Sequence, residues 1–438
     1  MSDPPILGPD PARDVADPAV RSGQSRRRAP LGLRTKPMRG RDPAELRRAA
    51  TPLELLFDLA AVVAVAFCAE GLAEGLAEGR TVEALIRYPL VFFAIWWAWM
   101  EFTWFASAFD TDDAVYRVAI FVQMGGSLVL AAGAPEAFND GDFATVTIGY
   151  VLMRVGLISL WLRVRHDTTT MKGKATATRY AVSLTVLQVG WLALISTSNH
   201  TLFYVGFAAL VVGELAVPFI AQRPQATPWN PEHIAERYGL FTIIVLGESV
   251  VASTAGLRTA VDAGEGFADL AGVAAGGLVL VFAMWWLYFD QPAVHVAKAI
   301  RGSRRPGLRA ARWGYGHYLI FGSAAATGAG LALNIDRVGH HSAMTDQHAA
   351  LAVAVPAAVY AVTVWVLHEP RRSAGFKELR LLIVTALLAT SFLPEPVVFT
   401  ALVMVGAVIL ETYAGNRSQI ANDAVTASHA TARSESDS

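Results

Sequence analysis

Long apolar stretches of about 20 residues alternate with short polar connections through most of this 438-residue chain. A helix of that length covers ~30 Å of hydrocarbon, so each stretch is a candidate membrane span. Because the connection around Glu395 is very short, a count of eleven helices stays open beside twelve. The pattern predicts an all-α integral membrane protein of about twelve transmembrane helices, at 52–70, 84–107, 115–133, 146–165, 180–197, 201–221, 235–255, 267–290, 310–333, 348–369, 378–393 and 396–414.

The two halves of the chain share a pattern of aromatic and acidic residues. The segment Trp96–Glu101 has two Trp, an aromatic residue two positions on and then an acid, and Trp285–Asp290 repeats this order 189 residues later. The same shift lays the first helix on the seventh and places Asp58 one residue from Glu248. Six helices return the chain to its starting side, so we expect two parallel six-helix repeats. Each half also ends on a helix with one central acid, Glu214 or Glu411.

Charge is scarce and unevenly placed. Hydrophobic residues make up 54% of the chain and charged residues only 17%, against roughly 25% charged in soluble domains. If the N-terminus lies inside, 31 of the 36 Lys and Arg residues fall on the inner side, as the positive-inside rule requires. We therefore expect a multi-pass membrane protein with both termini in the cytoplasm.

The two ends of the chain differ in composition from the apolar middle. The first 48 residues are rich in Pro, Asp and Arg and contain no apolar run, which is typical of disorder. The expected organisation is a disordered cytoplasmic basic arm at 1–48, a first six-helix membrane repeat at 49–222, a second at 223–415, and a disordered cytoplasmic tail at 416–438.

Charged residues inside the apolar helices are the candidates for function. Each costs at least ~2.5–3.5 kcal/mol in the bilayer and therefore needs a partner or water. Glu54 and Asp58 stand four residues apart on one face of the first helix. Two carboxylates on one face repel each other unless a cation lies between them. For Glu54 the simpler interpretation is that it stabilises the N-terminus of the helix.

The seventh helix carries the densest polar pattern. His233 and Arg237 share a face at its cytoplasmic end, and Glu236 is offset to a neighbouring stripe. Glu248 lies about 18 Å beyond Glu236, at 1.5 Å per residue, which places it near the membrane midplane. We expect Asp58 and Glu248 to be membrane-embedded cation or proton sites, with Glu236 and Arg237 as a cytoplasmic gate pair.

Arg154 has no charged neighbour in its own helix, so we expect it to pair across helices with Glu101, Asp58 or Glu248. Three interpretations remain open: an ion pair that locks the bundle, a clamp on a substrate or ion, and a step in a proton relay. Asp290 matches Glu101 in the repeated motif and belongs to the same candidate pathway.

Other function classes find no support in the sequence. The one cysteine, Cys68, excludes an intramolecular disulfide and a Cys-based metal site. The chain has no nucleotide-binding P-loop, dinucleotide Gly fingerprint, His-Glu-x-x-His or Gly-x-Ser-x-Gly pattern. Membrane topology explains its basic residues, so nucleic-acid binding is not expected. We expect no enzyme, no catalytic residues, no cofactor and no bound metal, and the lipid bilayer as partner.

Three of these segments resemble a known family. Thr51–Leu59, His233–Ser249 and Trp285–Asp290 are similar to the signature stretches of the bacterial low temperature requirement protein A (LtrA) family, and the resemblance covers roughly residues 48–415. That family is named for a requirement during growth in the cold. The resemblance implies membrane location and architecture more than a mechanism.

Two functions follow as hypotheses. The first is a secondary transporter or ion/proton-conducting protein whose pathway lies between the first and seventh helices, with a small ion or small molecule as substrate. The second is a non-transporting membrane factor that supports the envelope or growth in the cold, with the buried charges as locks between helices. The oligomeric state stays open.

Overall fold

The computed structural model describes residues 35–43, 45, 48–262, 267–290, 293–303, 306–338, 344–368 and 376–413. These residues form helices and no strand. The predicted tail at 416–438 and the first 34 residues of the predicted arm lie outside the described residues.

The helices follow the apolar stretches closely. The first half contains α1 Pro52–Ala77, α2 Thr81–Phe109, α3 Ala114–Ala132, α4 Ala134–Asn139, α5 Ala144–Asp167, α6 Met171–Leu194 and α7 His200–Ala221. The second contains α8 Pro231–Asp262, α9 Phe267–Phe289, α10 Ala293–Arg301, α11 Pro306–Val338, α12 Asp346–His368, α13 Phe376–Ala389, a 3-10 turn Thr390–Phe392 and a C-terminal helix Pro396–Tyr413. Each of the twelve predicted stretches overlaps one of these helices. The short helices α4 and α10 were not predicted.

Ten helices in the described part of the chain are long and apolar enough to cross a membrane. Two of the twelve expected spans fall short of this standard. The apolar part of α6 contains Arg179 and Gln188, and α13 has only 14 residues. The prediction of a multi-helix membrane protein is confirmed, and the exact count of twelve stays a prediction.

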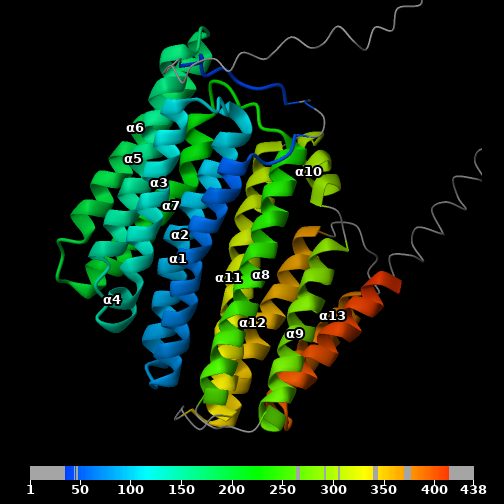
Figure 1. Cartoon of the computed structure of the whole chain (residues 1–438). Helices are drawn as coiled ribbons and strands as arrows, with labels where there is room; N and C mark the ends of the chain where they lie inside the picture. The colour runs from blue at the N-terminus through cyan, green and yellow to red at the C-terminus, as the bar shows by residue number, and fades with distance from the viewer. Residues whose placement is uncertain are drawn as a thin grey trace, which may run out of the picture.

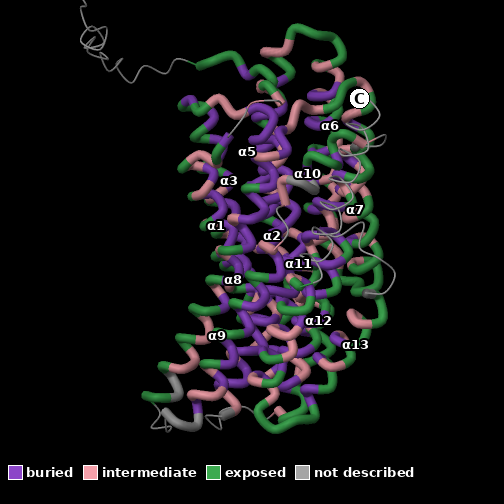
Figure 2. Tube along the Cα trace, turned by 90° about the vertical axis from the view of Figure 1, so that its right-hand side faces the viewer, coloured by how far each residue is buried: buried purple, intermediate pink, exposed green. Residues whose placement is uncertain are grey.

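The molecule exposes apolar side chains and buries charged ones, which is the distribution that a lipid environment favours. Figure 2 shows the buried positions along the middle of the helices and the exposed positions around the outside. Large apolar side chains that face outward include Val118, Phe121, Val186, Val212, Leu278 and Phe282. Glu54, Asp58, Arg154 and Arg237 are all at most 1% exposed.

The helices form two bundles that lie side by side, one from α1 to α7 and one from α8 to the C-terminal helix (Figure 1). In the first bundle α1 packs against α2 and α3, and α3 packs along α5. In the second, α8 packs against α9 and α11, and α11 packs along α12. The bundles meet where α1 contacts α8 and α11. Glu54 and Asp58 of α1 lie across this boundary from His233 and Arg237 of α8.

The chain before α1 is ordered from residue 35 to 43, although its composition predicted disorder through residue 48. The backbone N–H of Lys36 donates to Asp113 at 2.8 Å, and that of Met38 donates to Asp167 at 2.8 Å. The Met38 side chain is fully buried. Acidic residues at helix ends thus hold this segment through its backbone, which composition alone does not reveal.

Candidate functional site

The start of α1 is fixed by a capping box. The backbone N–H of Glu54 donates to Thr51 Oγ1 at 3.2 Å, and the Thr51 N–H donates to Glu54 Oε2 at 2.7 Å. Pro52 occupies the first turn, where its missing N–H costs nothing. Glu54 does stabilise the helix start, as its position suggested. The same side chain also contacts α8, so capping is only part of its role.

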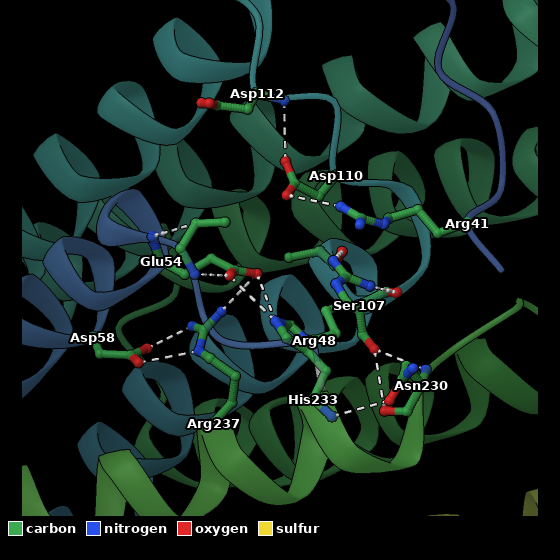
Figure 3. Close-up of polar contacts among 12 residues, drawn as sticks. Arg41, Arg48, Glu54, Asp58, Ser107, Asp110, Asp112, Asn230, His233 and Arg237 are labelled. Atoms are coloured by element: carbon green, nitrogen blue, oxygen red, sulfur yellow. Dashed lines mark hydrogen bonds and ion pairs between the residues drawn. The ribbon is translucent and has the colours of Figure 1, made fainter. Parts of the chain in front are cut away.

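The start of α8 is held in a similar way by Asn230. Its Oδ1 accepts from the backbone N–H groups of Glu232 and His233, at 2.9 and 3.1 Å. Its Nδ2 donates to the backbone oxygen of Glu45 at 2.8 Å, and its own N–H donates to Ser107 Oγ at 3.0 Å. The segment before α1 and the end of α2 thereby fix where α8 begins, as Figure 3 shows for Ser107, Asn230 and His233.

Glu54, Asp58, His233 and Arg237 form one buried network between α1 and α8 (Figure 3). Arg237 donates twice to Asp58, at 2.6 Å from Nη2 and 3.1 Å from Nε. Its Nη1 lies 3.2 Å from Glu54 Oε1, and His233 Nε2 lies 3.2 Å from a Glu54 oxygen. Asp58 also accepts from Trp99 Nε1 at 2.6 Å. We name these four charged or titratable residues the α1–α8 network.

The network is buried from solvent. Each of its four side chains is at most 1% exposed. The two carboxylates that share a face of α1 have the Arg237 guanidinium between them, which is the cation that their spacing required. With His233 protonated the charges balance, and with His233 neutral the network carries one net negative charge. These contacts hold α1 against α8 over their first two turns.

The structure does not bring Asp58 and Glu248 together, and their correspondence in the two halves stays a prediction. The 189-residue shift of the Trp motif would place these carboxylates at equivalent positions. Instead Asp58 faces Arg237, 179 residues on, and Glu54 faces His233 at the same separation. Glu248 lies 11 residues beyond Arg237, or about 16 Å along α8 at 1.5 Å per residue.

Arg154 centres a second buried cluster, between α2, α5 and α7. Its Nη1 lies 2.5 Å from Glu101 Oε2, and its Nη2 donates to Tyr150 at 2.6 Å. Glu101 was one of the three partners predicted for it. Its Nη2 also lies 4.0 Å from Glu214 Oε2. Four further donors, Trp97, Tyr150, Gln188 and Trp191, satisfy Glu214 at 2.8–3.3 Å.

Glu214 was missed as a site residue. Its one signal in the sequence was a lone acid at the centre of an apolar helix. The donors that stabilise it come from three other helices, so the residues near it in the sequence did not indicate the cluster. With one Arg and two acids, the cluster carries one net negative charge when all three are ionised.

The remaining predicted residues lie outside both clusters. Glu236 is exposed, and its expected partner Arg237 points to α1 instead, so the predicted gate pair is not formed. Asp290, at the end of α9, accepts from Thr412 Oγ1 at 3.2 Å. It does not join Glu101 or Arg154. Glu248 is half-buried and lines a cavity.

That cavity, of about 430 Å³, lies between α1, α8 and α11 beyond the network. Ala and Gly residues form much of its wall, and their small size leaves space between the helices. No Lys or Arg is among the described residues that line it. Within the described chain no three acidic or histidine side chains stand close enough to hold a metal ion. We call this cavity between α1, α8 and α11 the acidic cavity after its four carboxylates, Glu70, Glu74, Glu248 and Asp336.

Helices that can span a bilayer, apolar outer faces and buried charge clusters define a multi-pass helical membrane protein. The chain belongs to the family of the bacterial low temperature requirement A protein (LtrA), whose family model matches residues 49–414. It is 30% identical over 292 residues to a Rhizobium meliloti (strain 1021) protein named uncharacterized protein RA0937; the match covers 63% of this chain and 67% of that protein. No solved structure matches it. The family membership predicted from the motifs is confirmed.

Proposed function

We propose that the chain is a secondary transporter or ion-conducting protein for cations, with its pathway along the interface of α1 and α8. The acidic cavity carries this proposal. It brings Glu70, Glu74 and Glu248 together with no lysine or arginine among its described lining residues. Such a cavity concentrates cations over anions, because charge of one sign in a low-dielectric wall focuses the field.

The position of the cavity supports a pathway rather than a surface pocket. It extends along α1 from Ala77 back to Val65 and along α8 from Gly256 back to Val245. Val65 lies seven residues beyond Asp58, about 10 Å along the helix. The α1–α8 network therefore stands in line with the cavity, as a closed charged barrier at its inner end. A cation that moves further must displace or rearrange the Arg237 pairing.

The proposed setting is the bacterial plasma membrane with both termini in the cytoplasm. The clustering of 31 of 36 Lys and Arg residues on one side supports this orientation. It places the α1–α8 network toward the cytoplasm and the mouth of the acidic cavity toward the outside. Each acid in the cavity then costs less, because water can reach it from that side.

We also propose that the two halves are parallel repeats. Corresponding helices pack alike: α1 with α2 and α3 as α8 with α9 and α11, and α3 with α5 as α11 with α12. The starts of α1 and α8, Pro52 and Pro231, are 179 residues apart, which is also the separation of the paired residues in the network. A two-fold relation between the halves would bring such equivalent positions together.

Flux of Na⁺, K⁺ and H⁺ in proteoliposomes tests the transport function. The decisive variant is Glu248→Gln, because Glu248 forms no ion pair with the described residues, so its neutralisation spares the fold. We expect wild-type flux that falls at least tenfold in this variant. Asp58→Asn should reduce flux as well, because it upsets the charge balance of the α1–α8 network.

The matched control is Glu83→Gln, which removes an exposed acid at the start of α2, outside the cavity. It should leave flux unchanged. Equal flux in wild type and Glu248→Gln, with both well folded, would rule out the acidic cavity as the pathway.

A second candidate is a non-transporting membrane factor, favoured by the buried ion pairs of the α1–α8 network. In that case the network serves only to hold the bundles together. Absence of wild-type flux for all three cations, together with a large loss of stability in Asp58→Asn, would favour this second function.

A further inference from the structure

A second cavity, of about 310 Å³, opens beside the connection between α7 and α8. Its walls come from α2, α5, α6, α7 and α11, so it is separate from the acidic cavity. The volume is at the lower end of the range for small-molecule sites, about 300–1,000 Å³. We call it the aromatic cavity after six lining residues, Trp104, Trp161, Tyr180, Phe219, Trp229 and Tyr315.

These rings line the cavity from several sides in mutually supporting pairs. Trp161 and Tyr180 stack face to face, with centroids 4.0 Å apart and planes 5° apart. Trp104 and Trp229 meet edge to face at 5.0 Å. Hydroxyl contacts fix two of the walls, since Tyr180 accepts from Gln222 at 2.7 Å and Tyr315 donates to a backbone oxygen of α7 at 3.1 Å. The faces of such rings attract cations through their quadrupoles.

A buried carboxylate completes the cavity. Glu101 lines it with a side chain only 6% exposed. Its Oε2 pairs with Arg154, but its Oε1 is buried and has no hydrogen-bond partner among the described residues. An unsatisfied buried carboxylate oxygen is costly unless a donor or a cation reaches it. When Glu101, Glu214 and Arg154 are all ionised, the cluster has one negative charge in excess, which Arg154 does not neutralise.

Arg223 is the one other charged residue that lines the cavity in the described chain, and it is exposed at the rim. An anion would meet the negative cluster at the base of the cavity. A neutral ligand without an O–H or N–H donor would leave Glu101 Oε1 unsatisfied. A small inorganic cation has no alkyl groups to pack against the rings. An organic ammonium ion matches both features, because its alkyl groups fit the rings and its charge faces the carboxylate.

We propose that the aromatic cavity binds an organic ammonium ion, with Glu101 as its counter-ion and the rings of Trp104, Trp161, Tyr180 and Trp229 around its alkyl groups. This site goes beyond cation movement between α1 and α8 and stands without it. The occupant is a water-soluble ammonium ion rather than a lipid headgroup, because the connection at residues 222–229 forms the rim.

Calorimetric titration of the full chain in nanodiscs of phosphatidylglycerol tests the site. The probes are choline and its uncharged carbon isostere. We expect choline to bind at least tenfold more tightly than the isostere. Glu101→Gln should weaken choline binding about tenfold or more, because it removes the buried charge. Trp229→Leu should weaken it about 3- to 30-fold, the range of one cation–π contact.

Two controls separate the site from general effects. Glu83→Gln removes a carboxylate elsewhere, and Trp285→Leu removes a half-exposed Trp of α9 outside the cavity. Both should leave choline binding unchanged. Trp229 lies in the connection before α8, so Trp229→Leu reports on the site even if Glu101→Gln fails to fold.

Equal binding of choline and its isostere, or unchanged choline binding in folded Glu101→Gln and in Trp229→Leu, would overturn the proposal. Nanodiscs that contain phosphatidylethanolamine distinguish the source of the ammonium group. Unchanged choline affinity in them supports a free ion, and a loss of affinity overturns that part in favour of a lipid headgroup. Neither result depends on flux, so this site and the transport pathway can fail separately.

Discussion

The ion pair of Asp58 and Arg237 should be the strongest single polar link between the two bundles. It consists of two charge-assisted hydrogen bonds, at 2.6 and 3.1 Å, between fully buried groups. Each such bond contributes roughly 1.5–3 kcal/mol. Arg237→Leu removes both bonds and the contact to Glu54, and it leaves two carboxylates on one face of α1. We expect it to lower the free energy of unfolding by about 3–5 kcal/mol.

A double-mutant cycle tests that reasoning. Asp58→Leu leaves Arg237 with Glu54 as its one remaining carboxylate partner in the network. This variant should therefore also lower the free energy of unfolding. The double variant Asp58→Leu/Arg237→Leu has one carboxylate and His233 and no unpaired guanidinium. We expect a coupling energy of about 2–3 kcal/mol, measured by denaturant unfolding of the purified protein in micelles. Additive effects, within about 0.5 kcal/mol, would refute the view that the pair acts as a unit.

Three further outcomes follow from the geometry. Gly149→Ala should destabilise the fold by about 1–3 kcal/mol, because its Cβ would lie 2.3 Å from a backbone nitrogen of α3. Gly125→Ala has open space around its Cβ and should be neutral in thermal unfolding. Arg163 donates to Asp113 and holds the pKa of that carboxyl well below its ordinary value, so Asp113→Asn should cost roughly 1–3 kcal/mol at neutral pH. A carboxyl whose pKa is lower in the folded state stabilises the fold at pH values above its ordinary pKa. The cost of Asp113→Asn should therefore shrink as the pH falls below about 4, when unfolding is followed against pH. Glu248→Gln should leave the unfolding temperature unchanged, in contrast to Arg237→Leu.

The sequence predicted the helices well because membrane spans leave a local signal. A run of about 20 apolar residues has few alternatives to a helix in a bilayer. α6 shows the limit, since Arg179 and Gln188 reduce its apolarity although it packs against α5 and α7. The ordered segment 35–43 shows another limit, because its backbone is held by acidic residues more than 70 positions away in the sequence.

The partners of the buried charges were only partly predictable. Spacing along one helix revealed that Glu54 and Asp58 share a face, and that His233 and Arg237 do. It could not reveal that these two faces meet, because the register of α1 against α8 depends on where both helices begin. The 189-residue shift of the Trp motif differs from the 179-residue separation of the residues that contact each other. The capping residues Thr51 and Asn230 set the register in the structure.

The two ends of the α1–α8 interface differ in electrostatics. At the first turns, acids of α1 face bases of α8, and attraction in a dry setting draws the helices together. Toward the other end, Glu70 and Glu74 of α1 share a cavity with Glu248 of α8, and like charges oppose close approach there. A cation that entered the cavity would remove that repulsion and favour closure of the outer end. The same helices thus have a fixed end and an end whose spacing depends on charge.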